Sequence, residues 1–367
     1  MVESIESTKS NTLHIQRGSR RTLWLTLFLL LLFNGTAEMF VRMDFFQAPL
    51  TPPKMGSSHY QLGHKLAWLD AQIQQNGPVD CLMLGSSMTD ASMNPDIFEN
   101  AYQAVTGRDL HCFNFGINGS SASSTAVMAR ILVEDYNPRL LILGTDPRDY
   151  ALPIDDPDVM AVLDSAWIRY RLGEFSLDGW LTDVSYLYRY RQHISRLLRF
   201  EYKDTLWSDT QLNDPFLSNG YTPIKKTNLH VVDPPDLSHA SYEVTYYNRI
   251  YSAYEMLDVN LTALETIMDY NNMGTQVIVV EMPLSNGLYY FFGNGKADYN
   301  RYVAVIRELA SLHQAPFWRT EPLDLIPADG WSDYSHLNTI GAEAFSRWLG
   351  QRVGEAIEKG TIEIAER

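Results

Sequence analysis

The chain has 367 residues, of which 45% are apolar, 12% aromatic and 20% charged. This composition predicts a sizeable packed core and excludes a disordered, collagen-like or coiled-coil protein. The net charge of −15 argues against nucleic-acid binding, because neutralising phosphates requires a basic surface. Two cysteines are too few for a disulfide framework, and no group of Cys and His residues has the spacing of a zinc site.

The chain begins with a basic segment that is followed by an apolar one. Residues 1–21 contain four basic and two acidic side chains, a net charge of +2. Leu23 to Phe33 then follow without a charged residue. Extending the apolar run to Val41 includes Asn34 and Glu38, and it brings the length close to the ~20 residues that cross a bilayer.

Three interpretations of this apolar run are open. In the first, residues 22–42 are an uncleaved transmembrane signal anchor and residues 1–21 are a cytoplasmic tail, because basic flanks stay in the cytoplasm. In the second, a signal peptide is cleaved after Ala37, which follows the small residues Gly35 and Thr36. In the third, the run is a buried core helix, although its place behind a basic N-terminal flank argues against this. The first two put the rest of the chain outside the cytoplasmic membrane, either anchored to it or secreted or periplasmic.

After a linker and lead-in helix at 43–78, the domain from 79 to 367 is expected to alternate strands and helices. Short apolar runs that end at a turn residue are typical of buried parallel strands. Four such runs occur, at Val79 to Leu84, His111 to Phe115, Arg139 to Leu143 and Gln276 to Val280. Helices are expected after the cap Asn94-Pro95 and at 121–135 and 298–313. The pattern predicts an α/β sheet with functional loops at the carboxyl ends of its strands.

A long insertion is expected between the third and fourth strands. About 130 residues separate them, far more than a crossover helix needs. The stretch at about 151–270 is rich in Tyr, Trp and Arg and reads as mostly helical, for example over Asp183 to Phe200 and Tyr242 to Tyr270. An irregular section lies between these at 208–240. We interpret the stretch as an insertion that covers one end of the sheet and not as an independent domain.

Loops after the first three strands, together with one C-terminal motif, carry residues suited to catalysis. Ser87 follows the first strand at a helix entry, where its hydroxyl and its backbone N–H are both useful to a nucleophile. The loops Asn114 to Ser121 and Gly144 to Asp149 follow the second and third strands. Near the C-terminus, Asp333 can accept the Nδ1 proton of His336, which leaves Nε2 free to take a proton from a serine.

These blocks resemble those of the SGNH (GDSL-like) hydrolases. The matching residues, in chain order, are Gly85-Ser86-Ser87, Gly116, Gly144 and Asp333-x-x-His336, and the resemblance covers roughly 79–149 and 276–356. It implies a flavodoxin-like three-layer α/β/α fold with a parallel sheet in the order 2-1-3-4-5. It also implies a Ser–His–Asp triad that acts on esters with no metal and no organic cofactor.

The resemblance further implies a role for each matching residue. Ser87 would be the nucleophile, His336 the general base and Asp333 its orienting partner, with the backbone N–H groups of Ser87 and Gly116 facing the oxyanion. Membrane-anchored members of the family, including those similar to the D-alanyl-transfer protein of teichoic acids and to alginate acetylation proteins, handle acyl groups on envelope polymers.

This chain departs from the family pattern in two places. Ser86 stands where the family has an Asp, outside the triad. Thr145-Asp146 stands where the third block usually offers an Asn side chain to the oxyanion. An ionised Asp146 cannot donate a hydrogen bond and would repel a developing negative charge. Either Asn118 or the Thr145 hydroxyl replaces the missing donor, or the site has two backbone donors only and is slow.

Other residues near these blocks have two interpretations each. Arg148 either binds a substrate carboxylate or phosphate or pairs with Asp149 or Asp146, and we favour the ion pair. The stretch that begins with Tyr289 and Tyr290 either lines an acyl or sugar pocket or packs the insertion. Cys81 and Cys112 are expected to be neighbours on adjacent strands. Two buried thiols are the favoured state and a disulfide the other.

The sequence therefore predicts a serine esterase or O-acyltransferase that acts on an acyl ester of an extracytoplasmic carbohydrate. Its expected partners are an acylated carbohydrate or small ester substrate, the membrane through the N-terminal helix, and proteins of envelope-polymer biosynthesis. The alternative is a non-catalytic SGNH-like module that binds glycan or scaffolds an envelope assembly machine. We expect Ser87 Oγ and His336 Nε2 to lie within ~3–4 Å of one another if the first prediction is right.

Overall fold

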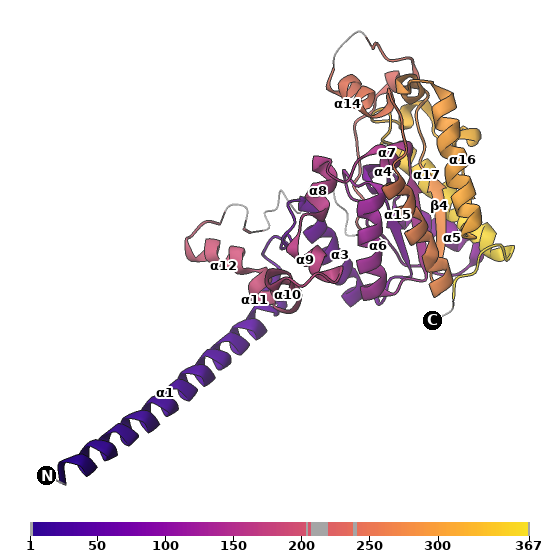
Figure 1. Cartoon of the computed structure of the whole chain (residues 1–367). Helices are drawn as coiled ribbons and strands as arrows, with labels where there is room; N and C mark the ends of the chain where they lie inside the picture. The colour runs from indigo at the N-terminus through magenta and orange to yellow at the C-terminus, as the bar shows by residue number, and fades with distance from the viewer. Residues whose placement is uncertain (1–2, 203–204, 207–218, 238–240, 366–367) are drawn as a thin grey trace. The chain divides into compact units, whose positions relative to one another are not determined.

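The computed structural model describes residues 3–202, 205–206, 219–237 and 241–365 (Figure 1). The chain divides into two compact units. The smaller comprises Met1–Pro53 and Trp180–Ser208, and the larger comprises Lys54–Gly179 and Asp209–Arg367. All the candidate site residues named above belong to the larger unit.

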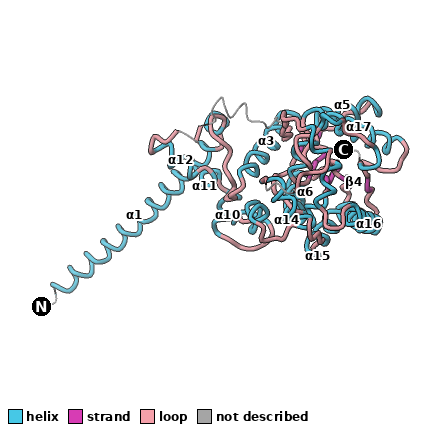
Figure 2. The backbone as a smooth tube through the Cα atoms, turned by 90° about the horizontal axis from the view of Figure 1, so that it is seen from above, coloured by secondary structure: helices cyan, strands magenta, loops and turns pink. Residues whose placement is uncertain are grey.

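A five-stranded parallel sheet forms the centre of the larger unit (Figure 2). Its strands are β1 (Cys81–Leu84), β2 (Cys112–Asn114), β3 (Leu140–Thr145), β4 (Gln276–Glu281) and β5 (Phe317–Trp318). Their order is β2-β1-β3-β4-β5, which confirms the order that the family resemblance implies. Four of the strands coincide with the apolar runs found in the sequence. The fifth has two half-buried residues and was not located beforehand.

The two faces of the sheet are covered by different helices, which confirms the three-layer α/β/α fold. Side chains alternate across each strand, so Leu82 and Leu84 of β1 enter one hydrophobic cluster while Cys81 and Met83 enter the other. The first cluster contains residues of α3 (Tyr60–Asn76), α6 (Ala122–Tyr136), α15 (Asp258–Met268) and α16 (Lys296–Leu312). The second contains residues of α5 (Pro95–Thr106) and α17 (Thr339–Glu358).

Local sequence sets the start of both helices on the second face. The Asn94 side chain caps α5 by accepting a hydrogen bond from Asp96 N, and Pro95 occupies the first helical position. Asn338 caps α17 in the same way through Ile340 N. The two helices then pack closely at Gly350, where a Cβ atom would lie 2.2 Å from the Phe98 carbonyl oxygen.

The long connection between β3 and β4 is mostly helical, as predicted. Its elements are α7 (Pro147–Ala151), α8 (Pro157–Leu163), α9 (Ala166–Arg171), α10 (Leu177–Val184), α11 (Tyr186–Arg189), α12 (Arg191–Leu198), η1 (Leu229–Val232), α14 (Tyr242–Tyr251), α15 and η2 (Asp269–Met273). The remaining elements of the larger unit are α4 (Ser87–Ser92), η3 (Asn286–Phe291), η4 (Glu321–Leu323) and η5 (Ala328–Gly330). The predicted irregular section at 208–240 lies partly outside the described residues.

The smaller unit contains α1 (Glu3–Val41), α2 (Asp44–Gln47), α11 and α12. Residues Arg20–Val41 of α1 are long and apolar enough to cross a membrane, and only 6% of the most apolar window is buried. The core-helix interpretation is therefore wrong. The C-terminal end of α1 is fixed by the Glu38 carboxylate, which accepts hydrogen bonds from Ser185 Oγ and from the backbone N–H groups of Tyr186 and Leu187.

Cys81 and Cys112 face each other in register on β1 and β2. Both side chains are fully buried and both thiols are free. Burial raises the pKa of each thiol, so both are neutral core side chains. The favoured interpretation is confirmed.

Candidate active site

The turn after β1 presents Ser87 at the first position of α4. Gly85 has a φ of +147°, and a Cβ atom there would lie 2.2 Å from Thr89 Oγ1 and 2.7 Å from the Gly144 carbonyl oxygen. Glycine is therefore required for the chain to turn sharply from the strand into the helix. Ser87 N–H lies in the first helical turn, where backbone N–H groups have no intrahelical acceptor.

Ser87 and His336 are 249 residues apart in the sequence and in contact in the structure. Ser87 Oγ lies 2.8 Å from His336 Nε2, inside the range expected for this pair. On the other side of the ring, His336 Nδ1 lies 2.8 Å from Asp333 Oδ2. Because an ionised carboxylate only accepts hydrogen bonds, the Nδ1 atom carries the proton and Nε2 accepts the Ser87 O–H.

The loop that carries His336 is held by its own backbone. Asp333 Oδ1 accepts hydrogen bonds from Ser335 N at 2.9 Å and His336 N at 2.8 Å, and Trp331 pairs with Leu337 across the loop. Burial raises the pKa of Asp333, but the charge and hydrogen bonds of His336 and these N–H groups lower it further, so the carboxyl is ionised. Burial lowers the pKa of His336, and Asp333 raises it more, so the net pKa lies above the usual value.

Two residues that sequence reasoning missed complete this network. Tyr247 OH, on α14, lies 2.8 Å from Ser335 Oγ and donates to Asp333 Oδ1 at 3.2 Å. Ser335 Oγ in turn lies 3.2 Å from His336 Nδ1. The Tyr247 ring packs against Phe291 and Tyr334. The sequence indicated only that Tyr247 belongs to a helix, and no local pattern pointed to Asp333.

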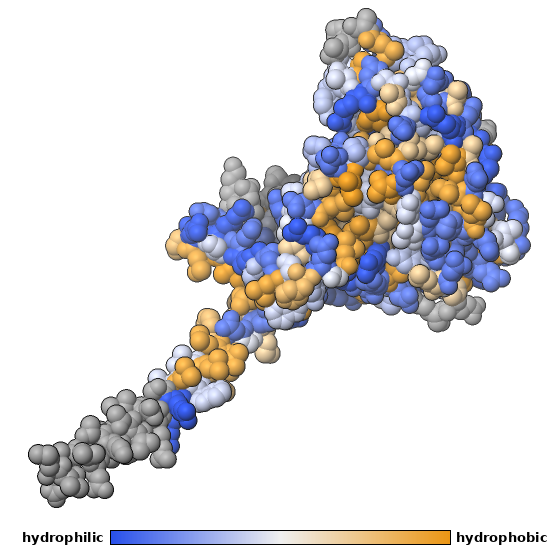
Figure 3. Space-filling view, viewed as in Figure 1, coloured by the Kyte–Doolittle hydropathy of each residue, from blue (hydrophilic) through white to orange (hydrophobic). Residues whose placement is uncertain are grey.

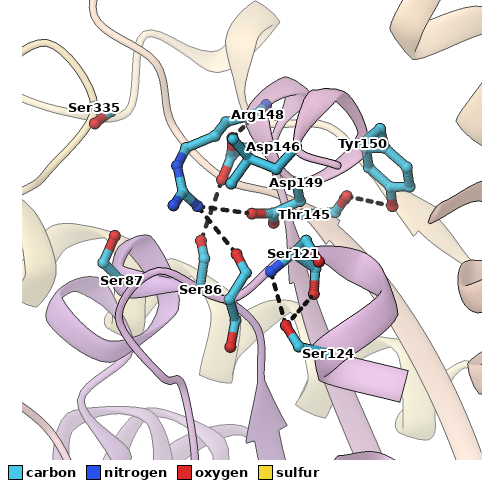
Figure 4. Close-up of polar contacts among 12 residues, drawn as sticks. Ser86, Ser87, Ser121, Ser124, Thr145, Asp146, Arg148, Asp149, Tyr150 and Ser335 are labelled. Carbon is cyan, nitrogen blue, oxygen red and sulfur yellow. Dashed lines mark hydrogen bonds and ion pairs between the residues drawn. The ribbon is translucent and has the colours of Figure 1, made fainter. Parts of the chain in front are cut away.

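The loop after β3 forms a buried charged cluster beside Ser87 (Figure 4). Asp146 caps α7, its Oδ1 accepting from Arg148 N at 2.8 Å while its Oδ2 accepts from Ser86 Oγ at 3.3 Å. Burial raises the pKa of Asp146 and of Asp149, against the lowering effect of the Arg148 charge. Asp146 thus places a buried carboxyl group at the position where the sequence resemblance predicts an amide.

Arg148 is held by protein groups. Its Nη1 lies 3.5 Å from Asp149 Oδ1 and donates to the Ser120 carbonyl at 3.0 Å, and its Nε donates to Tyr246 OH at 2.7 Å. The side chain is buried. The ion pair that the sequence analysis favoured is present.

Two of the predicted oxyanion donors already have contacts within the protein, and a third is placed by its backbone. Gly116 N donates to Asn114 Oδ1 at 2.9 Å. The backbone N–H of Asn118, and not its predicted side-chain amide, donates to Gln61 Oε1 at 2.7 Å. Thr145 Oγ1 lies 2.7 Å from Tyr150 OH, and Figure 4 shows that this contact points away from Ser87. Gly116 N–H would have to leave its partner to bind an oxyanion, whereas Ser87 N–H has no hydrogen-bond acceptor among the residues that the structure describes.

Tyr289 and Tyr290 differ in their surroundings. Tyr289 is buried against Tyr299 of α16, with a ring-centroid distance of 5.0 Å, and Lys296 Nζ lies 4.6 Å from the same ring. Phe291 and Phe292 of the same stretch pack against rings of the insertion, namely Tyr247, Tyr251 and Tyr254, which fits the interpretation in which the stretch packs the insertion. Tyr290 is 54% exposed. The rings that pack against Tyr334 of the Asp333 loop come instead from Tyr247 and Phe291.

Comparisons with known proteins give distant structural similarity only. No protein-family model matches the chain, and no curated protein matches it. Among solved structures, the chain is similar to an aryl esterase from M. smegmatis, with 12% identity over 77% of this chain and 99% of the other and a TM-score of 0.34. A lipase/acylhydrolase from Enterococcus faecalis matches with 12% identity, 79% and 100% coverage and a TM-score of 0.34. A carbohydrate acetylesterase family member from Sinorhizobium meliloti matches with 12% identity, 77% and 98% coverage and a TM-score of 0.32. At such scores these similarities carry no argument about activity.

Proposed function

We propose that this chain is an SGNH-type serine hydrolase, an esterase or O-acyltransferase in which Ser87, His336 and Asp333 form the catalytic triad. The observation that carries the proposal is the chain of contacts from Ser87 Oγ through the His336 ring to Asp333, with both distances at 2.8 Å. The raised pKa of His336 suits a base that must hold a proton while the ester bond breaks. The sheet order agrees with the fold of this family.

The proposed reaction has two acyl-transfer steps. Ser87 Oγ attacks the ester carbonyl carbon while His336 Nε2 takes the hydroxyl proton, which gives a tetrahedral oxyanion and an imidazolium that Asp333 stabilises. The C–O bond to the leaving alcohol then breaks, His336 returns the proton to that oxygen, and an acyl-serine remains. Water or a sugar hydroxyl attacks the acyl-serine in the reverse sense, and Ser87 regains its proton.

The membrane helix and the family resemblance support a proposal for the substrate and the location. A span at Arg20–Val41 with Arg20 and Arg21 on the cytoplasmic side would put the catalytic unit outside the cytoplasmic membrane. α1 continues in helical conformation through Ala37 to Val41, and Glu38 binds α11, which favours an anchor over cleavage after Ala37. We therefore propose an acylated carbohydrate of the cell envelope as substrate, and proteins of envelope-polymer biosynthesis as partners.

A fluorophosphonate probe tests the proposed chemistry without knowledge of the substrate, because it phosphonylates an activated serine. Labelling of the full chain is expected, and Ser87→Ala should abolish it. The matched control is Ser311→Ala, since Ser311 is an exposed serine on α16 and its removal should leave labelling unchanged. A screen of acyl donors with product analysis would then separate hydrolysis from transfer.

One observation favours the alternative, a non-catalytic SGNH-like module that binds glycan or scaffolds an assembly. A carboxyl group, that of Asp146, occupies the place of the usual oxyanion donor. Absence of fluorophosphonate labelling in folded protein, together with glycan binding, would support this alternative and refute the proposed enzyme.

A further inference from the structure

The smaller unit carries an exposed apolar and basic surface at the C-terminal end of α12. Leu198 and Phe200 are each 77% exposed. Arg196 and Arg199 are exposed as well, and within the described part of the chain neither forms an ion pair. From Val184 to Phe200 the sequence has four arginines and no acidic residue, although the whole chain has a net charge of −15. We call Arg196, Leu198, Arg199 and Phe200 the α12 patch.

The α12 patch is unfavourable in water. Phe200 adopts a left-handed backbone conformation, with a φ of +60°, at a helix end where glycine is the usual residue. A bulky side chain in this conformation is strained, and the exposed ring gains nothing from burial to offset the strain. Two large apolar side chains, Leu198 and Phe200, also lie exposed two residues apart, between and beside two arginines. The strained backbone of Phe200 and the two exposed apolar side chains are therefore unfavourable if this surface faces water.

The helix that carries the α12 patch packs against a small hydrophobic cluster that includes the end of α1. The last residue of α1, Val41, is buried together with Leu50 and Tyr190, and Ile194 and Leu197 on the inner face of α12 pack against this cluster. The 22 residues of Arg20–Val41 would span about 33 Å at 1.5 Å per residue, close to the ~30 Å hydrocarbon thickness of a bilayer. If α1 crosses a membrane, its C-terminal end and the cluster around Val41 lie at the boundary between acyl chains and headgroups.

We infer that α12 lies in the headgroup region of the bilayer that α1 crosses, with Leu198 and Phe200 at the acyl-chain boundary and Arg196 and Arg199 bound to lipid phosphates. Arginine binds phosphate through its planar fork, and its long stem lets the charge reach the headgroups while neighbouring apolar side chains insert. The inference requires α1 to span the membrane, and it is independent of any chemistry at Ser87.

Further exposed hydrophobic side chains lie along α1 and just after its C-terminal end. Figure 3 shows hydrophobic side chains exposed along the coloured part of α1 and again near α12. Besides the span itself, Phe40, Met43 and Phe45 are exposed at the helix end and in α2. They lie within four residues of Val41, so the same boundary region would accommodate them.

The position of Leu198 can be measured in the full chain reconstituted into phospholipid vesicles. A fluorescent NBD label on Leu198→Cys is expected to give blue-shifted emission and to be quenched by lipids brominated on their acyl chains. The matched control is the same label on Met273→Cys, which is 72% exposed on the larger unit. The native thiols of Cys81 and Cys112 are fully buried and should not compete for the label.

Stronger quenching at position 198 than at position 273 supports the inference. Quenching at position 198 that is equal to or weaker than at 273 overturns it. Because both side chains are exposed, these substitutions are expected to leave the fold intact. Phe200→Cys provides a second labelled position with the same expected result if Leu198→Cys does not fold.

The arginine contacts have a separate test in the same vesicles. Quenching at position 198 is expected to be stronger in vesicles of phosphatidylcholine mixed with phosphatidylglycerol than in phosphatidylcholine alone, because anionic lipid attracts basic residues. Arg196→Gln/Arg199→Gln should remove that difference. The control, Arg130→Gln/Arg347→Gln, changes two exposed arginines of the larger unit and should retain it. If the difference survives in Arg196→Gln/Arg199→Gln, the arginine–phosphate contact is wrong.

Discussion

Replacing Asp146 by asparagine is expected to make the proposed enzyme faster. Asparagine caps helices as well as aspartate, so its Oδ1 can still accept from Arg148 N, now 2.8 Å from Asp146 Oδ1. Its Nδ2 group then takes the position of Oδ2, 3.3 Å from Ser86 Oγ. Where the Asp146 carboxyl is ionised, the substitution exchanges an acceptor that repels negative charge for a donor that stabilises it.

The size of the gain follows from the number of donors that become available. An amide nitrogen has two hydrogens, and the Ser86 hydroxyl can accept one of them, which leaves one for the oxyanion. Removing one oxyanion donor from an enzyme costs ~10²–10³ in kcat. Because the new donor enters a site that is not shaped around it, we expect kcat for a reactive ester in Asp146→Asn to rise by about tenfold to a hundredfold.

The same substitution should also change how the free energy of unfolding depends on pH. Burial raises the pKa of Asp146 above its usual value of 3.8, so the folded state disfavours ionisation. The wild type therefore loses stability as the pH rises through the raised pKa, and Asp146→Asn does not. Urea denaturation should find the variant increasingly more stable than the wild type as the pH rises from about 4 through the raised pKa of Asp146.

Steady-state hydrolysis of a chromogenic ester by the two proteins is the assay. Asp149→Asn is the control, because it removes a neighbouring buried carboxyl without changing the cap of α7. No acceleration in folded Asp146→Asn would refute the donor argument. Equal acceleration in Asp149→Asn would refute it too, since a general loss of negative charge would then explain the gain.

Three further predictions address the same unit. Ser87→Ala should lower ester hydrolysis by about 10⁴-fold or more without changing the unfolding transition. In the wild type, kcat/KM should rise with pH through the raised pKa of His336 and then level off, because only the neutral ring accepts a proton. In Asp333→Asn, a pH–rate profile should show this rise at lower pH and a maximal kcat/KM that is about 10⁴-fold smaller. Lys65→Met leaves Asp90, now 2.5 Å from Lys65 Nζ, as a buried unpaired carboxyl, and urea denaturation should measure a loss of about 3–5 kcal/mol.

Much of the fold could be predicted because each central strand has a recognisable pattern in its own sequence. Cys81–Leu84 and Leu140–Thr145 are buried on both faces, so Cys81–Leu84 and Leu140–Leu143 are unbroken apolar runs, and each run is followed by a glycine. Phe317–Trp318 has no such run, because an edge strand of two half-buried residues needs no longer apolar stretch. The buried ion pair of Lys65 and Asp90 was also not predicted. Lys65 lies in α3 and Asp90 in α4, and the sequence around neither residue indicates that the two are in contact.

The candidate site divides in the same way between local motifs and contacts made by the fold. Asp333 and His336 are three residues apart, so their contact is a property of one loop and can be anticipated from spacing. Tyr247 and Asp333 are 86 residues apart in the sequence, and their hydrogen bond depends on the packing of α14 on the loop. No sequence pattern indicates this contact. Ser335 was overlooked because a serine next to a histidine has no distinctive pattern.

The oxyanion donors are the part of the site that sequence reasoning is least able to assign. A sequence motif identifies Gly116 as a candidate donor. It does not indicate that Gly116 N–H already donates to Asn114 Oδ1 at 2.9 Å, because this hydrogen bond depends on the orientation of the peptide plane at the end of β2. An Asp in place of an Asn, by contrast, is visible in the sequence, and its consequence depends on whether burial and Arg148 leave it charged. Since burial favours the neutral form and Arg148 the charged one, the protonation of Asp146 decides whether the site opposes or supports an oxyanion. Asparagine at this position is neutral at every pH. The difference in rate between the wild type and Asp146→Asn therefore reports the charge of the Asp146 carboxyl during catalysis.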